Sequence, residues 1–269
     1  MRHKGSVPKL DAKQLESLDQ HLHEHTDTRV KDIVAYVEQT YGITDTVQGM
    51  TDLLRRLDYV YKKPKKLPGK HPDVETQREF VDRYNELKQA KGKEDPIYFM
   101  DGVHPQHNSV AAYGWIKRGT TKTLESNTGR QRVNINGAVN LDQLNVVTEI
   151  DERVNAPSSI ALLKKLIRKH RKAETIYVIC DNARYYRSRL VREFIAGTKI
   201  VLIFLPPYCP NLNLIERLWK YFRKEILYNA YYEKFSDFKA ACHNFFDAIK
   251  AHSTVIRTLL TEKFQIIGA

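Results

Sequence analysis

The chain has 269 residues, a length that fits one large domain or a large and a small one. Its 44 Lys and Arg exceed its 32 Asp and Glu by 12, and its hydrophobic share of 42% is typical of a globular protein. No apolar run approaches the ~20 residues of a membrane span, and the N-terminus lacks the apolar region of a signal peptide. Three widely separated cysteines exclude a disulfide framework and a CxxC zinc site. We therefore expect a cytoplasmic protein, without membrane contact, whose partner is a polyanion.

The N-terminal residues are predicted to form three short helices with apolar residues at helical spacing. The first helix begins after Asp11, the second ends near Gly42, and the third covers about 46–57, followed by a β-like stretch at 59–61 and several lysines. This order is typical of a winged helix-turn-helix, whose third helix enters the DNA major groove, although other small helical bundles share the periodicity. The expected DNA contacts in this region are Gln48, Thr51, Arg55, Lys62 and Lys63.

Pro68, Gly69 and Pro72 indicate a linker, and 74–91 is predicted to be a charged connecting helix. We therefore expect a small all-α domain at 1–68, a linker and connecting helix at 69–95, and a larger domain at 96–269.

From residue 96 onward, short apolar runs alternate with helical segments. Their order, β-β-β-α-β-α-β-α, predicts an α/β fold with a mixed sheet and helices on its faces. The expected strands are 97–100, 113–117, 132–140, 175–180 and 199–205, with 143–150 extending the antiparallel part. The expected helices begin at Pro157 and cover about 185–195, 213–228 and 235–251.

Two of the predicted buried strands each end on an aspartate, Asp101 and Asp181. Ligands of such sheets bind outside the carboxyl ends of the strands. If the two strands are neighbours, two like charges lie side by side, and a hard divalent cation such as Mg²⁺ relieves their repulsion. The alternative is that each aspartate only caps a loop.

Glu216 is expected in the first turn of the helix over 213–228, with Asn213 as the N-cap. Glu216 borders the apolar face of this helix, and the positive helix N-terminus favours its charge. The alternative is a glutamate that only complements the helix dipole. Glu225 projects roughly 180° away from Glu216 and is a poor substitute.

The positive charge is concentrated around Asp181. Residues 164–192 hold ten basic side chains against two acidic ones, a net charge of +8. This run is either a solvated helix face or a surface that follows DNA phosphates. The expected phosphate contacts are Arg184 and Arg187, just after Asp181, and Lys220 and Arg223, which continue the stripe of Glu216.

These residues together resemble a known family. Asp101, Asp181 and Glu216, with 34 residues between the last two, resemble the DDE triad of RNase H-like transposases, in particular the bacterial insertion-sequence branch of the mariner superfamily. The resemblance extends over essentially the whole chain. Its most specific parts are DGVHP (101–105), SNTGRQRVNINGA (126–138), DNARY (181–185), and LPPYCP (205–210) through ERLW (216–219).

The resemblance implies an RNase H-like catalytic domain in a DNA transposase of the cut-and-paste type, integrase-like in its chemistry, inserting at TA dinucleotides. Two Mg²⁺ ions, with Mn²⁺ able to substitute, would be held by Asp101, Asp181 and Glu216 and would support in-line displacement at phosphorus. The implied partners are double-stranded DNA, as terminal inverted repeats and target, and a second copy of the chain on that DNA. No Walker or G-x-G-x-x-G motif is present, so no nucleotide cofactor is expected.

The chain departs from the family pattern in two places. Leu214 stands where many members have Pro at the helix start. Family members carry two helix-turn-helix units, and this chain has room for one before residue 70, so we expect the first unit to be missing. Two alternatives to a transposase remain open: a catalytically silent DNA-binding repressor and a structure-selective nuclease with the same fold.

Overall fold

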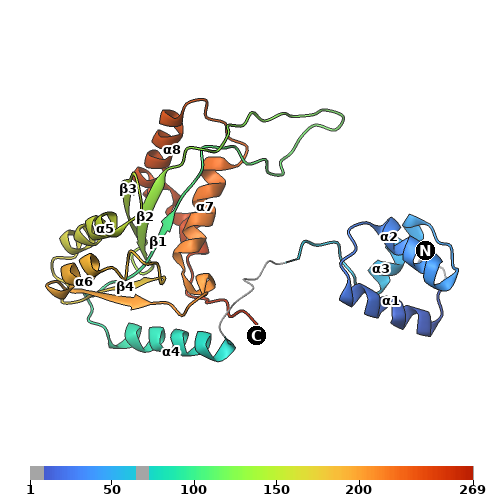
Figure 1. The fold of residues 1–269 in the computed structure, drawn as a ribbon, viewed down its shortest axis with the longest axis horizontal. Helices are drawn as coiled ribbons and strands as arrows, with labels where there is room; N and C mark the ends of the chain where they lie inside the picture. Colours follow the sequence, from blue (N-terminus) through green and yellow to red (C-terminus); the bar gives the residue numbers. More distant parts are fainter. Residues whose placement is uncertain (1–8, 65–72, 269) are drawn as a thin grey trace. The chain divides into compact units, whose positions relative to one another are not determined.

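The computed structural model describes residues 9–64 and 73–268, and the chain divides into two compact units, Met1–Lys66 and Leu67–Ala269 (Figure 1). The predicted linker residues Pro68, Gly69 and Pro72, and with them the predicted boundary at 68, lie outside the described residues. Within the described part, no helix is long and apolar enough to cross a membrane.

In residues 9–64, the first unit forms three helices, as predicted. Asp11 caps α1 by accepting a hydrogen bond from the Gln14 backbone N–H, and Gly42, with φ of 69°, ends α2 in the left-handed region. The helices are α1 (Ala12–Glu24), α2 (Val30–Tyr41) and α3 (Val47–Arg56). Their shared core contains the buried side chains Leu10, Leu18, Ile33, Val37, Met50 and Leu53.

The β-like stretch predicted at 59–61 is not a strand, and residues 59–64 are irregular. The Tyr59 hydroxyl is instead hydrogen-bonded to Asp19 Oδ1 of α1 at 2.6 Å, which holds this stretch against the helices. A strand needs a partner for its backbone N–H and C=O groups, and the described part of this unit contains none.

The second unit is built on a five-stranded sheet with the order β3-β2-β1-β4-β5. β1 pairs antiparallel with β2 and parallel with β4, so the predicted mixed sheet is confirmed. The strands are β1 (Ile97–Val103), β2 (Asn134–Asn140), β3 (Asn145–Asp151), β4 (Ile176–Cys180) and β5 (Ile200–Phe204). The helices are α4 (Val74–Ala90), α5 (Ala156–Lys169), α6 (Arg189–Ala196), α7 (Ile215–Leu227), α8 (Phe235–Asp247) and α9 (Ser253–Leu259), with short 3₁₀ turns at Pro210–Leu212 and Ile249–His252.

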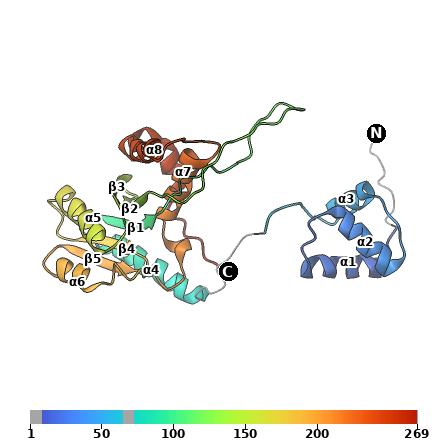
Figure 2. The ribbon, with the colours of Figure 1, turned by 45° about the horizontal axis from the view of Figure 1, so that its top comes forward.

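The order β-β-β-α-β-α-β-α is confirmed, but one of the predicted strands is wrong. Residues 113–117 are irregular, and the side chains of Tyr113 and Trp115 are fully exposed. β2 already has β1 on one side and β3, at 145–151, on the other, so no edge of β2 is left for this segment. It belongs to a long irregular connection over 104–133 that extends away from the sheet (Figures 1 and 2).

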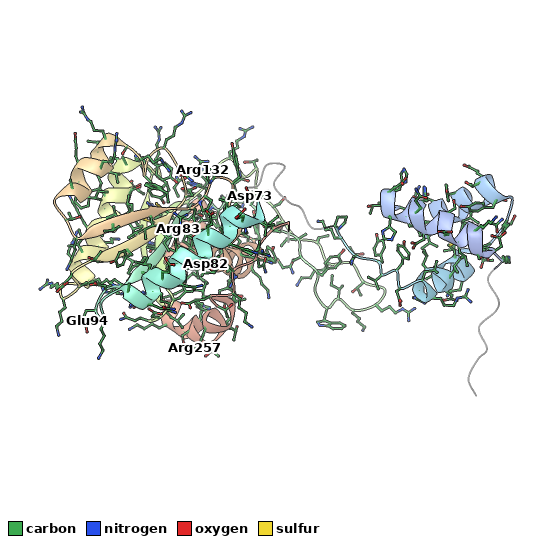
Figure 3. The ribbon with its side chains drawn as sticks, turned by 90° about the horizontal axis from the view of Figure 1, so that it is seen from below. Asp73, Asp82, Arg83, Glu94, Arg132 and Arg257 are labelled. Atoms are coloured by element: carbon green, nitrogen blue, oxygen red, sulfur yellow. The ribbon has the colours of Figure 1, made fainter. Side chains whose placement is uncertain are left out.

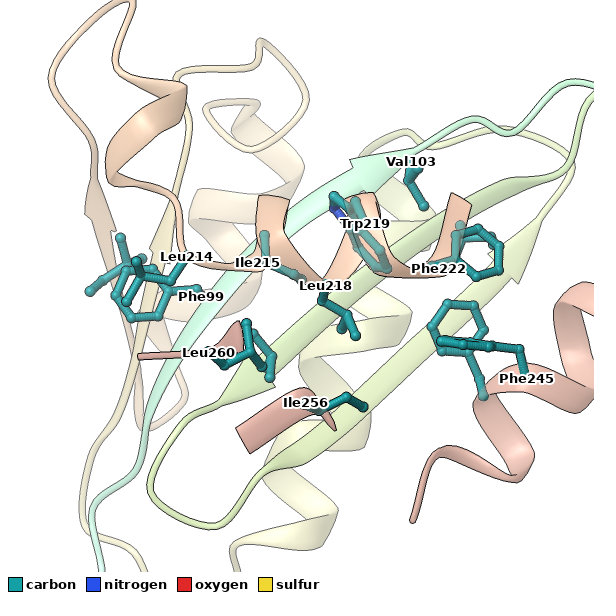
Figure 4. Close-up of a cluster of buried hydrophobic side chains, with 14 of the residues drawn as sticks. Phe99, Val103, Leu214, Ile215, Leu218, Trp219, Phe222, Phe245, Ile256 and Leu260 are labelled. Atoms are coloured by element: carbon teal, nitrogen blue, oxygen red, sulfur yellow. The ribbon is translucent and has the colours of Figure 1, made fainter. Parts of the chain in front are cut away.

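Helices cover both faces of the sheet (Figure 2). Alternate residues of β1 point to opposite faces, so Tyr98 and Met100 pack with α5 and α6, while Phe99 and Val103 pack with α4, α7, α8 and α9 (Figure 4). The side facing α7 is the larger core. α4 is the predicted charged connecting helix, and it is amphipathic: Phe80 is buried against this core, and Asp82 and Arg83 lie on its outer face (Figure 3).

A glycine in β2 allows α7 to lie unusually close to the sheet. A Cβ atom on Gly137 would lie 2.5 Å from the buried indole of Trp219, so only glycine fits beneath it. Gly137 pairs across the sheet with Asp101 of β1. The contact therefore fixes α7 against β2 at the position that pairs with Asp101.

Candidate active site

Asp101 and Asp181 lie next to each other at the carboxyl ends of β1 and β4. The last registered pair between these parallel strands is Met100 with Cys180, and each aspartate is the following residue. β1 continues to Val103, three residues beyond the predicted end at Met100, because it remains paired with β2 there. The Asp181 carboxylate accepts a hydrogen bond from the Ala183 N–H at 3.0 Å.

Glu216 reaches the same place from the first turn of α7. It lies close enough to Asp101 for its charge to raise the pKa of that carboxyl group. Leu214 occupies the N-cap position with φ of −66°, the angle that a proline would fix, so the departure from the family pattern leaves the backbone of this turn compatible with proline.

The three acidic side chains line one cavity of about 240 Å³. Its acidic side is formed by β1, β4 and α7, and its other side by the turn that follows β5. The lining residues are Asp101, Asp181, Asn182, Leu205, Pro206, Tyr208, Cys209, Pro210, Asn213 and Glu216.

The acidic groups are under electrostatic strain. Burial and the charge of Glu216 raise the pKa of Asp101 to about 7, although the Gly102 N–H opposes this shift. Burial also raises the pKa of Glu216, and the nearby Arg223 opposes that shift. The pKa of Asp101 therefore lies close to neutral pH.

Among the described residues, no group of three His, Cys, Asp or Glu side chains is arranged to hold a metal ion. Asp101, Asp181 and Glu216 line one cavity without converging into an ion cage. Their chemical type nevertheless suits a hard divalent cation, because carboxylate oxygens are its preferred protein ligands and a cation relieves crowded negative charge.

The prediction that Asn213 caps α7 is wrong, because Leu214 is the N-cap. The Asn213 side chain, 4% exposed, donates instead to the Met100 carbonyl at 3.2 Å, which links the end of β1 to the start of α7. Its Oδ1 atom is buried without a hydrogen-bond partner. A polar side chain this deeply buried beside two carboxylates belongs to the site, and local sequence reasoning assigned it only to the helix cap.

Asn182 is a second residue of the cavity that sequence reasoning did not assign. Its amide donates to the Leu205 carbonyl at 2.6 Å and accepts a hydrogen bond from Arg187. The guanidinium of Arg187 also lies over the Phe204 ring, 4.2 Å from its centroid. Arg187 therefore fixes the turn after β4 in addition to its predicted phosphate contact, and the position of Asn182 directly after Asp181 is the signal that could have identified it.

The other residues expected to contact phosphates near the site are exposed, as a DNA contact requires. They are Arg184, Lys220 and Arg223. The basic run itself is partly neutralised, because Lys165 pairs with Glu149 at 2.8 Å and Arg189 with Glu193 at 3.3 Å.

In the first unit, the expected base-reading residues surround an acidic one. Gln48 and Arg55 are exposed on α3, and both are hydrogen-bonded to Asp52. Thr51 is half-buried and donates to the Val47 carbonyl, an intrahelical contact. Lys62 and Lys63 are exposed in the irregular segment that follows.

Comparison with protein families gives two matches. The model described as "DDE superfamily endonuclease" matches residues 96–239, more than half of the chain. The chain belongs to the DDE superfamily of endonucleases. A winged helix-turn-helix model also matches, over residues 24–84. The expected family is thus confirmed, and it comes with a helix-turn-helix region on its N-terminal side.

Individual relatives agree with this assignment. A Shigella sonnei protein named "Insertion element IS630 uncharacterized 39 kDa protein" is 28% identical over 128 residues, which are 47% of this chain and only 37% of that protein. Among solved structures, the Mos1 strand transfer complex has a TM-score of 0.67 at 18% identity, covering 97% of this chain and 77% of that one. A Mos1 mariner paired-end complex with Mn has the same TM-score at 18% identity, covering 96% and 78%. At this identity the likeness shows a shared fold.

Proposed function

We propose that the protein is a DNA transposase that cleaves DNA at the ends of a mobile element and joins the freed ends to target DNA. One observation carries this proposal: Asp101, Asp181 and Glu216, from three separate elements of a DDE-family domain, line one cavity at the carboxyl ends of β1 and β4. We assign these three residues as the catalytic carboxylates. The protein acts in the cytoplasm on double-stranded DNA, at the nucleoid of a bacterial host.

The same carboxylates would hold divalent metal ions, two Mg²⁺ with Mn²⁺ able to substitute. The support is chemical. Burial and the charge of Glu216 raise the pKa of Asp101 to about 7, because the negative charges repel each other, and a bound cation relieves this repulsion. Structures of Mos1 with Mn and with Mg are among the similar folds. The chemistry that such ions supply is polarisation of the phosphodiester and stabilisation of the attacking and leaving oxygens.

The residues of the chain have distinct tasks in this reaction. The Asp181 carboxylate is oriented by the Ala183 N–H, and Glu216 lies in the first turn of α7, where the helix dipole favours its negative charge. Asp101, whose pKa is raised, loses its proton before the site is fully charged. Lys220 and Arg223, exposed on the same helix, bind DNA phosphates beside the cavity.

The helix-turn-helix region is proposed to read the terminal inverted repeats. α3 would enter the major groove, with Gln48 and Arg55 leaving Asp52 to contact bases, while Lys62 and Lys63 follow the backbone. Relatives named as strand-transfer and paired-end complexes support strand transfer, and we extend the proposal to a homodimer on DNA and insertion at TA.

The test uses the full chain, Mg²⁺ and linear DNA that carries the inverted repeats flanking its gene. We expect wild type to nick the repeat ends and to join them to a second DNA, and Asp181→Ala and Glu216→Gln to do neither. Glu225→Gln is the matched control, because Glu225 is exposed on the far side of α7. EDTA-resistant cleavage, or equal cleavage by wild type and Asp181→Ala, contradicts the proposal. Binding without cleavage would indicate a repressor, and cleavage without joining would indicate a nuclease.

A further inference from the structure

Tyr208 has two unusual features. Its backbone is in the left-handed region, with φ of 61°, where residues other than Gly, Asn and Asp are rare. Its side chain is 63% exposed although it belongs to the lining of the cavity that holds the three carboxylates. The residue is therefore strained at the backbone and gains little from packing.

The turn that carries Tyr208 explains the backbone angle but not the side chain. Pro207 and Tyr208 are the central residues of a tight turn after β5. A turn with proline first and a positive φ second is ordinarily made with glycine in the second place. Glycine would relieve the strain, so the fold alone gives no reason for a tyrosine here.

The turn that carries Tyr208 is anchored beside the strand that precedes Asp181. Its start is tied to β4 by the hydrogen bond from the Leu205 N–H to the Cys180 carbonyl, 2.9 Å long, and by the Asn182 amide on the Leu205 carbonyl. Its end is fixed by Cys209, which is 3% exposed. The aromatic ring is thus presented on a rigid support, one strand away from Asp181.

We propose that Tyr208 binds DNA by stacking its ring on an unpaired nucleobase next to the phosphate that the carboxylates act on. This inference rests on the proposed transposase function. The cavity offers carboxylates on one side and the apolar surfaces of Leu205, Pro206 and Pro210 on the other, which suits a nucleotide with its phosphate at the acidic side and its base at the apolar side.

The base must be unpaired, because the face of a base inside an intact duplex is covered by its neighbours. Stacking on Tyr208 therefore stabilises DNA that is opened at the cleavage point, and it is independent of the base sequence, since every base has an aromatic face. The ring adds binding energy at the reacting phosphate while the basic residues supply affinity along the backbone.

The experiment compares wild type with Tyr208→Gly and Tyr208→Phe on two forms of inverted-repeat DNA. One form is intact, and the other has an abasic site in place of the base next to the cleaved phosphate. On intact DNA we expect Tyr208→Gly to cleave roughly 5- to 100-fold more slowly and Tyr208→Phe, which keeps the ring, to recover most of the loss. On abasic DNA we expect wild type and Tyr208→Gly to cleave at the same rate.

Stability separates a ligand contact from a structural role. Because glycine relieves the backbone strain, Tyr208→Gly should unfold at the same or a higher urea concentration than wild type. Tyr113→Ala, an exposed tyrosine outside the cavity lining, is the control for general effects of removing an aromatic side chain.

Three outcomes overturn the inference: equal rates of wild type and Tyr208→Gly on intact DNA, an equal loss on intact and abasic DNA, or a less stable Tyr208→Gly. If wild type cleaves neither DNA, the proposed function itself fails and the inference fails with it. Cleavage by wild type that is unaffected by Tyr208→Gly refutes the inference alone.

Discussion

The raised pKa of Asp101 makes a prediction about folding. Burial and the charge of Glu216 raise this pKa from 3.8 to about 7, so the folded protein binds the proton more tightly than the unfolded chain does. Such a group contributes its full stabilisation when the pH is below its pKa in the unfolded chain. This contribution is lost as the pH rises through its pKa in the folded protein. At 1.36 kcal/mol per pKa unit, the second unit should lose up to roughly 4 kcal/mol of unfolding free energy between pH 4 and pH 8.

Replacing Asp101 with asparagine removes this titration at constant size. In EDTA at pH 8, we expect Asp101→Asn to be more stable than wild type by roughly 2 to 4 kcal/mol, and its stability to change less with pH. The assay is urea unfolding followed by tryptophan fluorescence, because both tryptophans, Trp115 and Trp219, are in the second unit and Trp219 is fully buried there. Asp82→Asn, an exposed carboxylate on α4, is the control and should behave as wild type.

Adding Mn²⁺ at pH 8 extends the test. Wild type should be stabilised in proportion to the logarithm of the Mn²⁺ concentration, and Asp101→Asn much less, because it lacks one carboxylate. Mn²⁺ affinity should rise as the pH is raised through 7, since Asp101 must lose its proton before it binds the ion. The reasoning is refuted if Asp101→Asn is less stable than wild type at pH 8 in EDTA, or if wild type gains stability from pH 5 to pH 8.

Three further substitutions test how the site is built. Gly137→Ala should lower the unfolding free energy by about 1–3 kcal/mol and also slow cleavage, because the new methyl group collides with the indole beneath α7, whereas Gly197→Ala, with open space around it, should do neither. Asn213→Ala should slow cleavage, but Asn211→Ala, in the same turn and outside the cavity lining, should lower only urea stability. Arg217→Ala should lower urea stability by about 2 kcal/mol, because Arg217 donates to three backbone carbonyls at and just beyond the end of α9.

The strands that carry the aspartates could be predicted because their signal is local. The residues before Asp101 and Asp181 are continuous apolar runs, the pattern of strands buried on both faces. That the two strands are neighbours, and which residues pair between them, depends on contacts between distant parts of the chain. Their adjacency could therefore be predicted only conditionally. The strand predicted at 113–117 is wrong for a related reason: the second side of β2 is paired with β3, so this segment cannot pair there.

The position of Glu216 depends on two contacts between residues that are far apart in the chain. Gly137 lets the indole of Trp219 lie against β2, and Asn213 ties the start of α7 to the Met100 carbonyl at the end of β1. An asparagine before a helix is most often a cap, so only the tertiary structure reveals its bond to a carbonyl 113 residues away. Gly137 is the residue of β2 that pairs with Asp101, and Met100 directly precedes Asp101, so both contacts lie next to the first catalytic carboxylate. The fold thus brings the Glu216 carboxylate against two others and holds it there despite their repulsion. We therefore expect substitutions that remove one of these charges to abolish cleavage but stabilise the fold. Substitutions that loosen α7 should lower both cleavage and stability.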